Sequence, residues 1–239
     1  MLKDRVEAPL HRSSVLPKVG NARRSHVVFA ELQRDIMLGD LAPRDLLPEL
    51  EIAARFQCSQ STVREALLKL QEEGLVLRKG HRGTMVADCN AHDARELLRI
   101  RHDIECRAVP RALERYDKTV HAALTGAFDK MRRAAADGDE YVLSIHDRDF
   151  HATLFAAADL PAVAPILGRC LIHNHRYKIL NSAPNRALAE TADRHAVILE
   201  ALAAGDGEAL RAALSHHIAT IVDMGPSIFD APDPAGPSA

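Results

Sequence analysis

Residues 50–76 read LEIAARFQCSQSTVREALLKLQEEGLV and contain two short helical patterns separated by a tight turn. The apolar spacing predicts helices over 49–56 and 61–73, with a turn at 57–59. Ser59 stands where a side chain can cap the second helix. Two short helices joined by so few residues predict a helix-turn-helix. The side chains expected to be buried on the first helix are Leu50, Ala53 and Ala54.

The neighbouring segments extend this motif into a winged form. An amphipathic pattern predicts a preceding helix over 25–38. Two short apolar stretches, 75–79 and 84–87, lie on either side of a glycine-containing turn and predict a β-hairpin, the wing. We therefore expect a winged helix-turn-helix over 23–88, preceded by a flexible arm at 1–22.

The rest of the chain is rich in Ala and Leu at helical spacing. It predicts an all-α antiparallel helical bundle over 89–226, followed by a disordered Pro/Gly-rich tail at 227–239. The fold class is therefore mostly α. The predicted helices lie at about 91–115, 119–137, 139–158, 161–180, 186–204 and 206–223.

Composition sets further bounds on function. The 239 residues carry a net charge of -2, and the hydrophobic share of 47% is typical of a globular protein with enough length for two domains. Residues 1–86 hold 14 Lys and Arg against 11 Asp and Glu, a weak basic bias in the direction expected for DNA binding. Without a signal peptide or a long apolar run, we expect a cytoplasmic protein that has no membrane segment. The four cysteines lack a CxxC pair, so we expect free thiols.

Three stretches resemble the GntR family: ELQRDIMLGDLAP at 31–43, the 50–76 segment, and RGTMV at 82–86. The second half is similar to the FadR-like branch with an FCD-type effector domain, through its Asp-x-x-Phe-His motif at 147–151 and two later histidines. The resemblance implies a transcription regulator, not an enzyme. It also implies a homodimer on a pseudo-palindromic operator, and we expect a repressor released by a small organic acid.

In a helix-turn-helix the second helix enters the major groove with its N-terminal residues toward the base edges. We expect Gln60, Ser61, Thr62 and Arg64 to contact DNA there, although the family usually has an arginine at position 60. A surface ion pair of Arg64 with Glu65 or Glu72 is the alternative. At the tip of the wing, the residues expected to contact phosphates or the minor groove are Lys79, His81 and Arg82.

Thirteen histidines are many for this length. Asp147 and His151 are four residues apart on one helix, and His195 and His217 lie on two others, so the four can meet only inside a bundle. Histidines on helices are more often solvated or satisfied within a core. The resemblance nevertheless points to these four as ligands of a divalent metal, zinc by default, with nickel or manganese possible. The secondary candidates are His102, His173, His175 and His216.

Arg101 matches a position at which the family directs an arginine toward the effector cavity. We expect it to bind a carboxylate of the effector, with a surface ion pair to Glu105 as the alternative. Arg176 is a weaker candidate for the same function. Two rival hypotheses for the second half are a metal-dependent enzyme, in which the cluster activates water, and a bundle that only dimerises.

Overall fold

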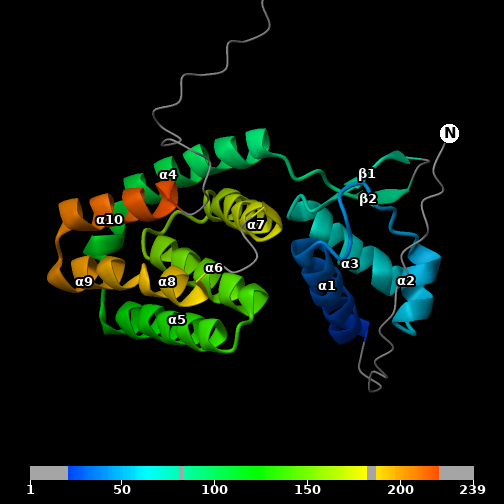
Figure 1. Cartoon of the computed structure of the whole chain (residues 1–239), viewed down its shortest axis with the longest axis horizontal. Helices are drawn as coiled ribbons and strands as arrows, with labels where there is room; N and C mark the ends of the chain where they lie inside the picture. Colours follow the sequence, from blue (N-terminus) through cyan, green and yellow to red (C-terminus); the bar gives the residue numbers. More distant parts are fainter. Residues whose placement is uncertain (1–20, 81–82, 182–186, 221–239) are drawn as a thin grey trace, which may run out of the picture.

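The computed structural model describes residues 21–80, 83–181 and 187–220. It confirms a mostly helical chain with a small winged helix on one side and a helical domain on the other (Figure 1). The N-terminal elements are α1 (Asn21–Leu38), α2 (Glu49–Arg55), α3 (Gln60–Glu72), β1 (Val76–Arg78) and β2 (Thr84–Val86). The helical domain holds α4 (Ala91–Glu114), α5 (Lys118–Ala136), α6 (Glu140–Ala156), α7 (Ala164–Asn181), α8 (Leu188–Asp193), α9 (Ala196–Ala204) and α10 (Gly207–Ala219).

The turn between α2 and α3 is held as the sequence predicts. The Ser59 hydroxyl accepts a hydrogen bond from the Thr62 backbone N–H at 3.2 Å, which caps the start of α3. The buried face of α2 differs from the prediction, because Leu50 is 69% exposed and Ala54 is also exposed. Ala53 is buried as predicted, and Ile52 and Phe56 are buried in place of the other two.

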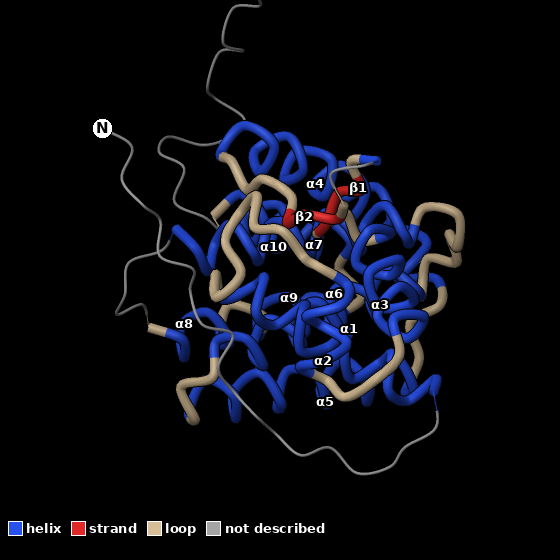
Figure 2. The backbone as a smooth tube through the Cα atoms, turned by 90° about the vertical axis from the view of Figure 1, so that its right-hand side faces the viewer, coloured by secondary structure: helices blue, strands red, loops and turns tan. Residues whose placement is uncertain are grey.

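The wing is a two-stranded antiparallel sheet in which Val76 pairs with Val86 and Leu77 with Met85. Figure 2 views the molecule from the winged-helix side and shows the two strands close to the start of α4. Gly74 joins α3 to the first strand with a φ of 76°, a conformation that favours glycine. The wing is thereby fixed directly to the end of α3.

In the helical domain, the predicted segment at 186–204 is two helices. α8 ends before Arg194 and α9 begins at Ala196, so His195 occupies the break between them. The apolar stripe is continuous across this break, which is why periodicity alone predicts one helix. Because of the break, His195 faces the domain interior with 0% exposure.

The winged helix and the helical domain share a hydrophobic cluster. Val28 and Leu32 of α1 belong to the same buried group as Tyr141 of α6 and Ile172 of α7. The two parts are therefore packed against each other, and α7 lies next to α1 (Figure 1).

Among the described residues, no helix has the length and apolar character needed to cross a membrane. The predicted arm at 1–22 lies almost entirely outside the described residues, and the predicted tail at 227–239 lies wholly outside them.

Candidate functional site

Four buried side chains from three elements converge inside the helical domain. Asp147 and His151 come from α6, His195 from the break before α9, and His217 from α10. Each is at most 3% exposed, and one potential ligand atom from each lies within 4.8 Å of the others. The structure thus brings together all four predicted metal ligands.

Neighbouring groups fix how two of the imidazoles are turned. His151 Nδ1 lies 2.5 Å from Glu105 Oε2, and His195 Nδ1 donates to the Ala192 carbonyl at 3.0 Å. Both rings therefore direct Nε2 toward the centre of the cluster. A hydrogen bond from the remote ring nitrogen is the usual arrangement for a metal-binding histidine.

Burial favours the neutral form of two of the histidines, His195 and His217, and neighbouring groups favour the ionised form of Asp147. Burial lowers the pKa of His195 to about 4, and burial together with His195 holds the pKa of His217 well below its ordinary value. Burial opposes ionisation of Asp147, but the neighbouring His175 and His195 hold its pKa well below the usual range. Neutral imidazoles and an ionised carboxylate are the forms that bind a metal.

The cluster also leaves polar atoms unsatisfied within the described part of the chain. Asp147 Oδ2, His195 Nε2 and His217 Nδ1 are buried and have no hydrogen-bond partner there. Unpaired buried polar atoms are costly, and a divalent cation would satisfy the acceptors among them. Three nitrogens and one oxygen are a donor set that suits zinc, nickel or manganese, so these residues fit a metal.

Arg101 lies one helical turn before Glu105 on α4 and its Nε donates to Glu105 Oε1 at 2.6 Å. The ion pair with Glu105 forms, but it is not on the surface, because the two side chains are 0% and 3% exposed. Nη1 and Nη2 of Arg101 are buried without a partner among the described residues. The structure therefore leaves two donors of a buried guanidinium free for an anion.

Arg176, the weaker candidate for effector binding, contacts the backbone between the two domains. Its Nη2 donates to the Ala87 carbonyl at 3.0 Å, and its Nη1 lies 3.5 Å from the Asp88 carbonyl. It therefore binds the backbone of the linker between the two domains. Sequence spacing could not reveal this contact, because the two partners lie nearly ninety residues apart.

The candidate DNA-contact residues divide into exposed and buried groups. Gln60, Ser61, Arg64 and Lys79 are exposed. Thr62 is 0% exposed, and its hydroxyl lies 2.9 Å from that of Ser59, so the prediction of a side-chain contact to DNA is corrected to a structural role in the turn. His81 and Arg82 lie outside the described residues.

Arg64 takes part in a surface ion pair, but its partner is neither Glu65 nor Glu72. Its Nε donates to Glu49 Oε2 at 2.6 Å, and Arg78 Nη2 lies 3.5 Å from the other oxygen of that carboxylate. Glu49 opens α2 and thus holds two arginines on the exposed side of the motif.

Two known family models match separate parts of this chain. The model of "Bacterial regulatory proteins, gntR family" matches residues 24–86, and the FCD domain model matches residues 96–220. The chain is a GntR-family regulator with an FCD domain. Members of this family are DNA-binding transcription regulators, and this chain is therefore a regulator and not an enzyme.

Individual relatives of this GntR-family regulator cover most of both chains. A probable D-xylose utilization operon transcriptional repressor of Paenarthrobacter nicotinovorans is 32% identical over 82% of this chain and 88% of its own length. The transcriptional repressor RspR of Escherichia coli is 28% identical over 81% and 85%. The structure of E. coli McbR/YncC shares the fold, with a TM-score of 0.68 and 24% identity over 82% of this chain and 93% of that one.

The secondary histidines of this GntR-family regulator have other partners. His102 Nε2 lies 2.9 Å from Ser215 Oγ, and His216 is exposed. His175 Nε2 donates to Asp147 Oδ1 at 3.0 Å. Sequence reasoning missed this contact and that of Glu105 to His151. Glu105 could have been found from its i, i+4 spacing to Arg101, whereas nothing in the sequence aligns His175 with Asp147.

Proposed function

We propose that this GntR-family regulator is a cytoplasmic homodimeric repressor that leaves a pseudo-palindromic operator when a small organic acid binds beside a metal. The observation that carries the proposal is the buried Arg101 guanidinium with two free donors next to the four-residue cluster. A bound metal, zinc by default, would supply positive charge and open coordination positions for a carboxylate. Arg101 would bind another oxygen of the same acid.

Repression is supported by two relatives, a probable repressor of a D-xylose utilization operon and the repressor RspR. In a two-fold dimer, two copies of α3 would read two half-sites, with their spacing fixed by the dimer axis. The residues proposed to contact DNA are Gln60, Ser61, Arg64 and Lys79. The proposed functional units are residues 23–88 for DNA binding and 89–226 for effector binding and dimerisation.

The test is metal content by mass spectrometry, followed by thermal unfolding with a panel of mono-, di- and tricarboxylic acids. Wild type should carry stoichiometric metal and His195→Ala should not. An acid present at a hundred times its Kd should add about 2.7 kcal/mol of stability, or roughly 5 to 10 °C. Arg101→Gln should keep the metal and lose this shift.

His216→Ala is the matched control, because it removes an exposed histidine adjacent to a proposed ligand. It should keep both the metal and the acid response. Wild-type protein without metal and without a response to any acid would refute the proposal and leave a bundle that only dimerises.

A further inference from the structure

Helix α7 contacts both the metal cluster and the DNA-binding domain. It lies between α1 and the rest of the helical domain (Figure 1). Its residues 173–176 span about one helical turn, so their side chains leave the helix in different directions. Each of these four side chains makes a polar contact with another part of the molecule.

His175 provides the contact to the cluster. His175 Nε2 lies 3.0 Å from Asp147 Oδ1, and the imidazole N–H donates to this carboxylate oxygen. The other oxygen, Oδ2, has no hydrogen-bond partner among the described residues and faces His195 Nε2 of the cluster at 3.4 Å. His175 is 1% exposed and Asp147 0%, so solvent does not compete with the bond.

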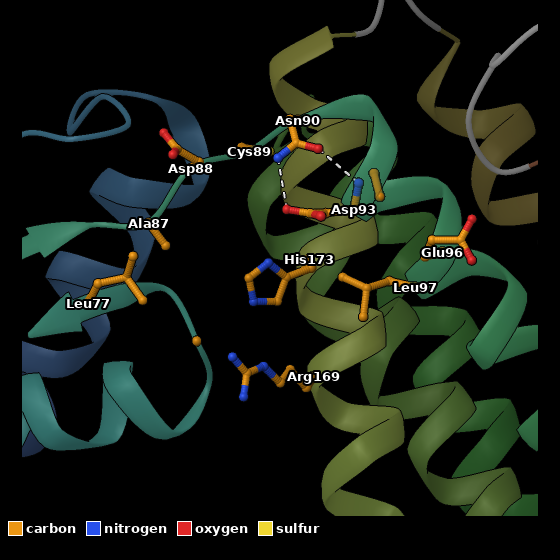
Figure 3. Close-up of a pocket in the computed structure, with 12 residues that line it drawn as sticks. Leu77, Ala87, Asp88, Cys89, Asn90, Asp93, Glu96, Leu97, Arg169 and His173 are labelled. Carbon is orange, nitrogen blue, oxygen red and sulfur yellow. Dashed lines mark hydrogen bonds between the residues drawn. The ribbon is translucent and has the colours of Figure 1, made fainter. Parts of the chain in front are cut away.

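His173 provides the contact to the end of α3. Its Nε2 donates to the carbonyl of Glu73, the residue that caps the C-terminus of the proposed recognition helix, at 3.0 Å. Arg169, one turn earlier, lies against Gly74, where an added Cβ would overlap its guanidinium. Figure 3 shows Arg169 and His173 extending from α7 toward the winged helix. Donors and cations suit this position because the C-terminal end of a helix is partially negative.

Arg176 and Asn174 provide the contacts to the linker and to α4. Arg176 is 0% exposed and binds the carbonyl of Ala87, as described above. Asn174 Nδ2 donates to the carbonyl of Ala94 in the first turn of α4 at 3.1 Å. Arg176 and Asn174, two positions apart on α7, therefore hold the start of the linker and the first turn of α4.

We infer that α7 transmits the state of the metal cluster to the recognition helix: His175 positions Asp147, while His173 and Arg176 hold the end of α3 and the linker. The inference rests on the proposed function, since it requires that the cluster binds a metal. Fixing Asp147 in its coordinating orientation favours one position of α7, and the contacts of His173 and Arg176 pass that preference to the winged helix. Coupling of this kind requires an element whose arrangement both sites influence.

The first experiment is hydrogen exchange of the full chain with zinc chloride or with EDTA. In wild type, zinc should slow amide exchange around Asp147 and also at residues 72–76 and 87–90. In His173→Ala, zinc should bind with a Kd within about twofold of wild type and protect the cluster, but the added protection at 72–76 should be lost. His216→Ala should behave as wild type.

The outcomes separate the two proposals. No zinc binding by wild type would refute the proposed function. Zinc binding with protection confined to the cluster would overturn the transmission by α7 and leave the metal site intact. Equal protection at 72–76 in wild type and His173→Ala would also overturn it.

The second experiment tests His175 as a positioning residue, with Co²⁺ as a spectroscopic probe. His175→Ala should weaken Co²⁺ binding about 10- to 100-fold and alter the absorption spectrum of the bound ion. His175→Gln, which keeps an N–H donor, should restore much of both. An unchanged Kd and spectrum in His175→Ala would contradict the assignment.

Discussion

Glu105 and His151 are joined across two helices, with 2.5 Å between the carboxylate Oε2 and the imidazole Nδ1. The same carboxylate binds Arg101 through its other oxygen. Burial alone would raise the pKa of Glu105, but His151 and Arg101 lower it to about 2. Glu105 therefore stays ionised and orients both a proposed metal ligand and the proposed acid-binding arginine.

Replacing Glu105 should weaken the metal site without removing a ligand. Glu105→Gln keeps an acceptor for His151 but loses the charge, so we expect zinc affinity to fall about 10- to 100-fold in a chelator competition assay. Glu105→Ala leaves Arg101 buried without its carboxylate and should cost about 3–5 kcal/mol in urea unfolding. Zinc affinity equal to wild type in Glu105→Gln would show that His151 needs no such partner.

The Glu49–Arg64 pair should restrain DNA binding. Glu49→Gln removes the carboxylate that holds Arg64 and Arg78, so both should become available to DNA and affinity should rise. Arg64→Ala should lose about 1–3 kcal/mol of binding. The measurement is fluorescence anisotropy with a duplex selected from a random pool by the wild-type protein. Arg107→Ala, which removes an exposed arginine paired with Asp103 on α4, should bind as wild type.

Gly74 should resist substitution because of its backbone. Its φ of 76° costs an L-residue about 1–2 kcal/mol, so Gly74→Ala should lower stability by that amount. The overlap with Arg169 involves an exposed, flexible side chain, and Gly74→Ala should therefore be only slightly less harmful in an Arg169→Ala background. Gly126→Ala, in the middle of α5 with open space around it, should instead stabilise by up to about 1 kcal/mol. Denaturant unfolding of Gly74→Ala, Arg169→Ala, their double variant and Gly126→Ala measures the predicted loss and gain of stability.

Glu73 should make stability depend on pH. Burial raises the pKa of its carboxyl above the ordinary value, although the hydrogen bond from Gln33 opposes this. A raised pKa in the folded state means that stability is lost as pH rises through that value. Glu73→Gln should therefore be more stable than wild type at pH 7, and the difference should shrink as pH falls through the raised pKa and vanish near pH 4.5. Urea unfolding between pH 4 and 8 measures this, with the exposed Glu65→Gln as the control that should show no such trend.

The sequence was sufficient for features that depend on local pattern. Ser59, the turn before α3 and the glycines of the wing act over a few residues, so their positions could be predicted. The four residues of the buried cluster could be predicted because the Asp147–His151 spacing and the family motif both point to them. Local pattern failed at Thr62, which was assigned by its place on α3 although its side chain faces inward.

Long-range contacts could not be predicted in the same way. The contact of Arg176 with Ala87 and that of His175 with Asp147 depend on how α7 packs against two other parts of the fold. The break at His195 depends on tertiary packing as well, since its apolar pattern continues from α8 into α9.

The hydrophobic cluster that joins Val28 and Leu32 to Tyr141 and Ile172 has a consequence for chimeric regulators. A winged helix transplanted from another family member would meet an α6–α7 surface shaped for a different α1. Such hybrids should fold and respond only when Tyr141 and Ile172 are exchanged along with the winged helix, so the boundary for recombination is a packed surface and not the linker at residue 88.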